Sequence, residues 1–382
     1  MTGSLHVKND KYYMVVNVYE NGQRKQKWIG TGLHVKGNKR QAERMLAKVL
    51  TDMSEQEENK RKPSNKPFAD VVRDWLSAVR LSVDVVTYQG YKDIANNHVI
   101  PYFDALGTTV GNLKHSMIQT YINTKADNGR RDGRGGLSAS SLRLHKNVIN
   151  QSCKYAVSEE LIASNPCAGV TLPQRTHIGY NYYTAAQVAE LLDKIRDDVL
   201  FSLIKMTAVY GLRRSEVLGL QWDAINFEEG IITIKRTVTK VYERIEKDKT
   251  KNRASYRSYP MTQDVRSMLT MLLAEEEQHR KDFGNQYLEN QYVFKWPNGT
   301  PFDPDYVTHH FSDLLNKHGL PHIRFHELRH SCASIMIVSG FTLKDVQEWL
   351  GHSTIDVTAD IYSHLDMDRK VKVGEKMTSV MC

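Results

Sequence analysis

The sequence predicts a multidomain protein that is mainly α-helical and has small β-sheets in two places. The chain has 382 residues, more than a single ordinary hydrophobic core organises. Amphipathic helical patterns dominate from residue 66 onward, whereas alternating β-forming residues occur only before residue 34 and between residues 230 and 260. The composition, 40% hydrophobic and 25% charged, is typical of globular proteins, and no apolar run approaches the roughly 20 residues that span a bilayer. We expect two or three domains in a cytoplasmic protein with no membrane partner.

The first segment, residues 1–62, is expected to form a small sheet followed by a helix. Residues 12–19 and 26–33 are rich in β-formers, and the Asn21-Gly22 dipeptide between them is typical of a hairpin turn. A helix is predicted over residues 41–53, after Asn38, and the charged residues 55–62 are predicted to form a linker.

This first segment carries most of the positive charge of the chain. The formal net charge is +8, and the first fifty residues alone hold ten cations against three anions. A polyanion such as double-stranded DNA is the partner that such a charge favours, because each neutralised phosphate releases condensed counterions. Lys25, Lys27 and Arg40 are the candidate DNA-binding residues of this segment.

The second segment, residues 66–173, is predicted to be entirely helical. Its helical patterns cover residues 68–79, a stretch from Thr87, residues 115–125 and residues 138–157. A set of basic residues is expected to be exposed and could line a DNA-facing surface, although a solvated bundle exterior explains them equally well: Arg80, Lys92, Lys114, Arg143 and Lys146.

The third segment, residues 184–382, is predicted to begin with a capping box formed by Thr184 and Gln187. Helical patterns continue to Leu220, strands are expected over residues 231–238, 241–245 and 256–259, and helices resume at Thr262. A mainly helical domain with a small antiparallel sheet is therefore expected.

Five stretches of this segment carry the residue types that phosphoryl transfer requires. They are Gly211–Glu216, Lys249–Arg253, His326–His330, Leu350–Ser353 and Asp360–His364. Guanidinium groups fit the non-bridging oxygens of a phosphodiester better than lysine does. A phenol, with a pKa of about 10, must lose its proton as it attacks, and a mobile lysine would protonate the departing 5′-oxygen. Two arginines, histidines, a lysine and a tyrosine thus form a site that needs neither metal nor cofactor.

In their order and spacing, these motifs resemble the tyrosine recombinase family, and within it the long integrases of phages and conjugative transposons. Gly211 to Glu216 match Gly-Leu-Arg-x-x-Glu, and His326 to His330 match His-x-x-Arg-His. Leu350 to His352 match Leu-Gly-His, and Tyr362 to His364 match the nucleophile motif. The resemblance covers essentially the whole third segment.

The resemblance implies a role for each matched residue. Arg213 and Arg329 would clamp the scissile phosphate, and His326 would accept a proton or hydrogen bond beside the attacking oxygen. His352 would bond a phosphate oxygen, and Tyr362 would be the nucleophile.

Two further roles are implied less directly. The lysine of the family lies in the hairpin turn, where Lys251, six residues before Arg257, is favoured over Lys249. Glu216 would brace Arg213 or His326, and His330 would support the site as a buried helix residue.

The resemblance also implies how the whole chain works. Residues 1–62 are similar to an arm-binding module with its linker, and residues 66–173 to a core-binding domain. A homotetramer on two DNA duplexes would exchange strands through a 3′-phosphotyrosyl bond and a Holliday junction, integrating or excising a mobile element. An excisionase or DNA-bending protein is a candidate partner, and the tail from Leu365 to Cys382 would pack on the same or a neighbouring subunit.

Two other classes of protein fit parts of the sequence. His326, Glu327 and His330 form a literal His-Glu-x-x-His, the pattern of zinc metallopeptidases. That interpretation lacks a third ligand and leaves Arg213 and Tyr362 unexplained. A non-catalytic DNA-binding regulator would explain the basic first segment but has no use for the complete set of catalytic residue types.

Overall fold

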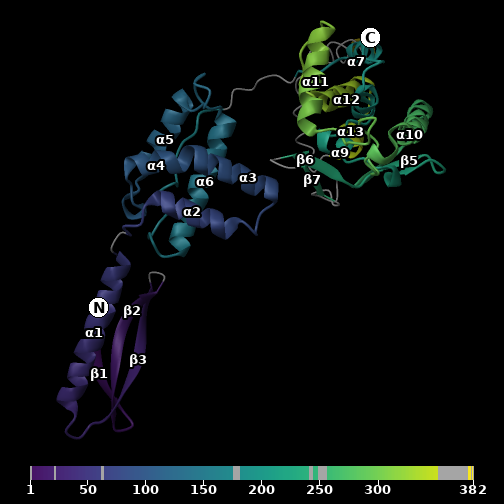
Figure 1. Cartoon of the computed structure of the whole chain (residues 1–382). Helices are drawn as coiled ribbons and strands as arrows, with labels where there is room; N and C mark the ends of the chain where they lie inside the picture. Colours follow the sequence, from purple (N-terminus) through teal and green to yellow (C-terminus); the bar gives the residue numbers. More distant parts are fainter. Residues whose placement is uncertain are drawn as a thin grey trace. The chain divides into compact units, whose positions relative to one another are not determined.

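The computed structural model describes residues 2–20, 23–61, 64–174, 181–240, 244–247, 256–351, 377–379 and 381. The chain divides into two compact units, Met1–Thr176 and His177–Cys382. Figure 1 shows a sheet with one long helix and a group of short helices in the first unit, and a mixed helical domain in the second. No helix within the described ranges is both long and apolar enough to cross a membrane.

The first unit begins with a three-stranded antiparallel sheet and a helix. The strands are β1 (Thr2–Lys8), β2 (Lys11–Glu20) and β3 (Gln23–His34), in the order β1-β2-β3. Strand β1 was not expected, because Gly3, Ser4 and His6 interrupt its β-forming pattern. The core of this module lies between the sheet and the helix and includes the buried side chains of Met14, Val16 and Ala42.

The helix that follows, α1 (Lys39–Arg61), is longer than the sequence pattern predicted. The prediction of a linker over residues 55–62 is wrong for residues 55–61, because these residues continue the helix. Glu, Gln, Lys and Arg are strong helix formers, so a charged stretch extends a helix that packing has already nucleated. The predicted turn at Asn21-Gly22 lies outside the described residues.

The helical part of the first unit surrounds one hydrophobic core that includes Phe68, Phe103, Tyr121 and Ile149. Its helices are α2 (Phe68–Val79), α3 (Val85–Ile94), α4 (Ile100–Leu106), α5 (His115–Asn128) and α6 (Ala139–Ser158). A π-helical turn over Ala95–Val99 joins α3 to α4, whose second residue, Pro101, has no N–H to donate to the preceding turn.

The second unit is built around a larger core that runs from Tyr183 to Leu328. Its helices are α7 (Ala185–Lys194), α8 (Phe201–Tyr210), α9 (Arg214–Leu218), α10 (Gln263–Phe283), α11 (Pro304–Lys317), α12 (Glu327–Val338) and α13 (Leu343–Leu350). Helix α7 starts at the predicted capping box, in which the Thr184 hydroxyl and the Gln187 side chain each bond the backbone of the other residue.

The strands of the second unit form two small antiparallel sheets. One has the order β4-β5-β8, from Ile225–Asn226, Ile231–Ile234 and Arg257–Pro260, and the other pairs β6 (Thr237–Lys240) with β7 (Arg244–Lys247). The prediction of one strand over residues 231–238 is wrong, because Lys235 and Arg236 both bond Asp223 and separate β5 from β6.

Candidate active site

Arg213 lies at the junction between two helices, as its sequence context predicted. Helix α8 ends at Gly211 in the left-handed conformation (φ +62°), and Arg213 is the N-cap residue of α9. Its Nη1 donates to Glu216 Oε1 at 2.6 Å, and its backbone N–H donates to Glu216 Oε2 at 2.9 Å. About a third of the Arg213 side-chain surface (34%) is exposed to solvent, so this arginine is not sealed off from an anion.

Gly211 also permits a close approach between α8 and α13. A Cβ at this position would lie 2.2 Å from Leu350 Cδ2 and 3.3 Å from Cys332 Sγ. Only glycine combines the positive φ with the lack of a side chain that this contact requires. The start of the Arg213 loop is therefore packed directly against the end of α13.

Arg329 comes from helix α12 and is fully buried at the same place. Its Nη1 donates to the Gly211 carbonyl and its Nη2 donates to the Leu350 carbonyl, both at 2.7 Å. Burial, with the nearby charge of Arg213, lowers the pKa of Arg329 to about 9, so the guanidinium is still charged at neutral pH. Two cations from distant segments thus lie close together, an arrangement that an anion would stabilise.

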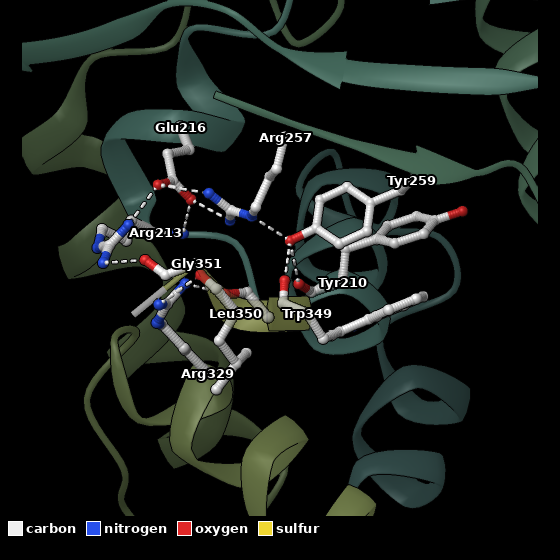
Figure 2. Close-up of polar contacts among 10 residues, drawn as sticks. Tyr210, Arg213, Glu216, Arg257, Tyr259, Arg329, Trp349, Leu350 and Gly351 are labelled. Carbon is white, nitrogen blue, oxygen red and sulfur yellow. Dashed lines mark hydrogen bonds and ion pairs between the residues drawn. The ribbon is translucent and has the colours of Figure 1, made fainter. Parts of the chain in front are cut away.

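Glu216 is the counter-charge of this site, and its main partner was not predicted. The buried carboxylate accepts two hydrogen bonds from Arg257, the first residue of β8, as well as those from Arg213 (Figure 2). Burial alone would raise the pKa of Glu216, but these bonds and charges outweigh it and lower the pKa to about 2. Sequence reasoning used Arg257 only to locate Lys251 and expected Glu216 to meet Arg213 or His326.

Tyr259 is a second residue that sequence reasoning missed. It lies two positions after Arg257 in β8, and alternate residues of a strand share a face. Its hydroxyl accepts from Arg257 Nε at 2.5 Å and lies 2.5 Å from the Trp349 carbonyl. The alternation in Arg257-Ser258-Tyr259 could have predicted from the sequence that Arg257 and Tyr259 share a face of the strand. It could not have predicted which residues they contact.

The last turn of α13 is the place where these contacts meet. The carbonyls of Trp349, Leu350 and Gly351 accept hydrogen bonds from Tyr259, Arg329 and Arg213, respectively (Figure 2). Gly351 ends the helix in the left-handed conformation (φ 67°), as predicted. It is also the last residue of the described range 256–351.

His326 and His330 lie at the start of α12, with their rings edge to face and 5.3 Å between centroids. His326 is the N-cap residue and keeps part of its surface in solvent, whereas His330 is partly buried. Partial desolvation of the His326 ring, with the charges of His330 and Arg329, lowers its pKa well below the ordinary value. The imidazole is therefore neutral at neutral pH and able to accept a proton.

The arrangement of Glu327 does not suit the zinc-peptidase interpretation. Its buried carboxylate accepts from the backbone N–H of Arg324 at 2.6 Å and from the Arg324 guanidinium at 2.8 and 3.1 Å. The carboxylate thereby fixes the turn that leads into α12 and is occupied by Arg324. Across the described ranges, no cluster of three or more His, Cys, Asp or Glu side chains could hold a metal ion.

Four predicted site residues lie outside the described residues: Lys249, Lys251, His352 and Tyr362. The described flanks end at Lys247 and Gly351, and β8 resumes the chain at Arg257. Of the predicted catalytic residues, the structure brings together Arg213 and Arg329, with His326 near enough for its pKa to respond to both charges, and it adds the predicted supporting residue Glu216.

The predicted DNA-binding residues differ in their surroundings. Arg80, Lys92 and Arg143 are exposed on the helical part of the first unit. The prediction that Lys146 is exposed is wrong, because it is partly buried and its Nζ donates to the Val170 carbonyl at 2.6 Å. It thereby ties α6 to the segment that follows the helices, a bond that the helical pattern alone does not indicate.

Lys25, Lys27 and Arg40 are exposed on the sheet module, but not on the open face of the sheet. Lys27 pairs with Val16, which is fully buried against α1, so Lys25 and Lys27 lie on the helix side. The open face carries Trp28, which is 51% exposed and lies beside the His6 ring at 5.3 Å.

Comparison with known proteins places this geometry in a family. Residues 181–369 match the phage integrase family, and residues 67–126 match the N-terminal SAM-like domain of phage integrases. A "tyrosine recombinase XerC-like" protein of Caldanaerobacter subterraneus subsp. tengcongensis is 27% identical over 334 residues, 82% of this chain and 83% of its own. The "ICEBs1 integrase" of Bacillus subtilis is 23% identical and covers 91% of this chain and 92% of its own.

Solved structures share the same fold. The Tn1549 transposon integrase in complex with transposon right end DNA matches with a TM-score of 0.64 at 20% identity, covering 81% of this chain and 99% of that one. A lambda integrase dimer bound to a core site matches with a TM-score of 0.58 at 14% identity, covering 95% of both chains. The predicted mainly helical, multidomain fold is thereby confirmed.

The chain belongs to the phage integrase family, the tyrosine recombinases. It is a site-specific recombinase, an enzyme that breaks and rejoins DNA strands. Neither the zinc-peptidase nor the regulator interpretation is supported.

Proposed function

We propose that Arg213 and Arg329 hold the scissile phosphate of a DNA strand while Tyr362 attacks it. The observation that supports this is the convergence of both guanidiniums on the last turn of α13, at Leu350 and Gly351. The chain continues from that turn through His352 to Tyr362. A phosphate placed between the two guanidiniums would relieve their mutual repulsion and accept two-pronged hydrogen bonds from them.

The reaction follows from these groups. The Tyr362 oxygen forms a bond to phosphorus, the bond from phosphorus to the 5′-oxygen breaks, and the strand keeps a 3′-phosphotyrosyl bond. Neutral His326 accepts the phenol proton, and Lys251 protonates the leaving 5′-oxygen. His352 bonds a phosphate oxygen, and Glu216 keeps Arg213 oriented. Rejoining is the reverse reaction with the 5′-hydroxyl of the partner strand.

Each step exchanges one phosphodiester for an ester of similar energy, so the mechanism requires neither ATP nor a metal ion. The protein supplies position and positive charge, which are the main contributions to phosphoryl transfer. The positive charge of the two arginines, placed in advance inside a largely buried site, is worth more than the same charge in water.

The three predicted segments would divide the work of DNA binding. We propose that residues 1–62 bind arm sites, residues 66–173 bind the core site together with residues 184–382, and exposed Arg80, Lys92 and Arg143 contact phosphates. A lambda integrase tetramer has been solved on a Holliday junction, which supports a homotetramer on two DNA duplexes for this chain. The substrate would be the attachment sites of a mobile element in the cytoplasm, with an excisionase or DNA-bending protein as a further partner.

A nicked DNA duplex tests the proposed chemistry. The duplex carries the crossover site, mapped beforehand from the joined ends of the element that encodes the chain, with a nick that lets the cleaved fragment diffuse away. We expect the wild-type protein to form an SDS-resistant DNA adduct that persists in EDTA. Tyr362→Phe should bind the same duplex and form no adduct.

Two results would contradict the proposal. An adduct that Tyr362→Phe still forms would assign the nucleophile to another residue. Cleavage that EDTA abolishes, and that added divalent metal restores, would point to metal-assisted hydrolysis in place of a phosphotyrosyl bond.

A further inference from the structure

Among the described residues, three side chains donate hydrogen bonds to the last carbonyls of α13, and one of the three, Tyr259, has no proposed contact to DNA. Arg213 and Arg329 bond the carbonyls of Gly351 and Leu350, at 3.4 and 2.7 Å. Tyr259 bonds the carbonyl of Trp349 at 2.5 Å. These carbonyls belong to the last turn of a helix, where no intrahelical N–H is available to satisfy them.

We propose that the Tyr259 hydroxyl is a positioning group for DNA cleavage, which anchors the end of α13 while the two arginines engage the phosphate. The inference rests on the phosphate-binding role proposed above for Arg213 and Arg329. In this proposal, Arg213 and Arg329 bind the phosphate. Tyr259 holds the end of α13, from which the chain continues to His352 and Tyr362.

The surroundings of Tyr259 suit an anchor. Its side chain is fully buried and its ring packs against the rings of Tyr210 and Trp349, with both centroid distances at 5.0 Å. Arg257 Nε donates to the hydroxyl oxygen, and the single hydroxyl proton faces two acceptors, the Trp349 carbonyl at 2.5 Å and the Tyr210 carbonyl at 3.2 Å. The shorter of these two contacts is the one to Trp349. Burial raises the pKa of Tyr259 to about 12, which keeps the proton on the hydroxyl throughout the neutral range.

The contact of Arg213 with α13, in contrast, is suited to being shared with a phosphate. The Arg213 bond to Gly351 is long, and the same guanidinium already donates to Glu216. Charged donors bind a phosphate oxygen more strongly than a neutral carbonyl, so a bound phosphate would draw the Arg213 guanidinium away from α13. Tyr259 has no positive charge and no solvent-exposed edge, so its bond to Trp349 is unaffected by the phosphate.

Strand β8 connects this anchor to the rest of the site. Arg257 and Tyr259 lie on the same face of β8, and Arg257 also binds Glu216, which orients Arg213. Strand β8 begins six positions after Lys251 in the chain. One short strand therefore comes after Lys251 in the chain, supports one proposed phosphate-binding arginine and holds the end of α13, which precedes Tyr362 in the sequence.

The test compares two single-oxygen deletions in the same aromatic cluster. Tyr259→Phe keeps the ring and removes the hydroxyl, and with it the bond to the Trp349 carbonyl and the contacts with Arg257 and the Tyr210 carbonyl. Tyr210→Phe is the matched control, because Tyr210 is equally buried in the same cluster and its hydroxyl donates to the Pro260 carbonyl instead. Both variants are compared with the wild type, as full-length proteins on the nicked duplex, at a temperature well below their melting points.

We expect Tyr259→Phe to form the covalent adduct roughly tenfold or more slowly in single turnover, with DNA affinity within about twofold of wild type. Tyr210→Phe should cleave at close to the wild-type rate. The rate of amide hydrogen exchange in the peptide covering α13 should rise in Tyr259→Phe and not in Tyr210→Phe. This measurement reports on the helix end itself, so it detects local loosening even if the variant is also less stable overall.

Three outcomes would overturn the inference while wild-type cleavage remains intact. They are a wild-type rate for Tyr259→Phe, an equal loss of rate in both variants, and a loss that appears only as weaker DNA binding. If the wild-type protein itself forms no adduct on the mapped site, the proposed function fails instead, so the two failures are distinguishable.

Discussion

Glu216 and Arg257 form a two-pronged ion pair inside the second unit, with Oε1–Nη1 and Oε2–Nη2 distances of 3.1 and 2.8 Å. The residues are 41 positions apart in the chain, one in α9 and the other at the start of β8. Glu216 is 1% and Arg257 is 9% exposed, so neither charge is compensated by bulk water. The same carboxylate orients Arg213. The ion pair therefore joins α9 to β8 and also supports a residue proposed to bind the phosphate.

The first prediction concerns this carboxylate. Glu216→Gln keeps the shape of the side chain and leaves two arginines without their counter-charge. Because breaking a buried ion pair from one side costs about 3–5 kcal/mol, we expect a marked fall in the free energy of unfolding, measured by urea denaturation. Glu277→Gln, on the exposed face of α10, is the control and should stay within about 0.5 kcal/mol of wild type. A Glu216→Gln protein as stable as the control would show that the pair is not structurally important.

A second prediction separates geometry from charge in the proposed phosphate clamp. Arg213→Lys keeps the positive charge but cannot donate to Glu216 and to a phosphate in the same two-pronged manner. We expect DNA affinity to change little and the single-turnover cleavage rate to fall by about 100-fold or more. Arg196→Lys, at an exposed surface ion pair, should leave both quantities unchanged. Equal rates for Arg213→Lys and wild type would exclude a bidentate role for Arg213.

The third prediction decides between Lys251 and Lys249. A substrate whose bridging 5′-oxygen is replaced by sulfur has a leaving group that needs no proton, because a thiolate is far more stable than an alkoxide. The variant that lacks the proton donor should cleave the ordinary duplex slowly and the sulfur-substituted duplex at close to the wild-type rate. We expect this rescue for Lys251→Ala and not for Lys249→Ala. Rescue of Lys249→Ala alone would assign the role to Lys249.

A fourth prediction concerns the pH dependence of stability in the first unit. The His145 ring is buried and bonded to the Tyr121 hydroxyl at 2.7 Å, and burial lowers its pKa to about 4. Below pH 6.5 the unfolded chain takes up a proton at this residue that the folded chain does not, so stability falls as the pH falls towards 4. From pH 7 to pH 5 the loss should be about 2 kcal/mol.

Hydrogen exchange in α5 and α6 at both pH values measures this loss. His145→Gln, which cannot titrate, should show a smaller difference between the two pH values, even if it is less stable at both. Some dependence should remain, because burial also lowers the pKa of His98, whose ring lies 4.8 Å from that of His145. A variant with the same pH dependence as wild type would assign the effect to other groups.

Much of this protein is determined locally and could be predicted from its sequence. The capping box at Thr184 and Gln187 and the left-handed end of α13 at Gly351 depend on a few adjacent residues, so their patterns indicate them directly. The same holds for the position of Arg213 at the start of α9. The order and spacing of the catalytic motifs indicated the family. Each motif consists of a few adjacent residues, so it can be recognised without knowledge of the tertiary structure.

The tertiary structure decided which of those stretches meet and through which atoms. Nothing near Glu216 in the chain indicates Arg257 as its partner, and nothing near Trp349 indicates Tyr259. Likewise, Lys146 is drawn inward by the carbonyl of Val170, which comes 24 positions later. The physical reason is that a buried polar group must find a partner wherever the fold supplies one, and that choice depends on packing between distant segments. Local patterns determined the helices and the motifs, and long-range burial determined how the arginines, Glu216 and Tyr259 are joined around the end of α13.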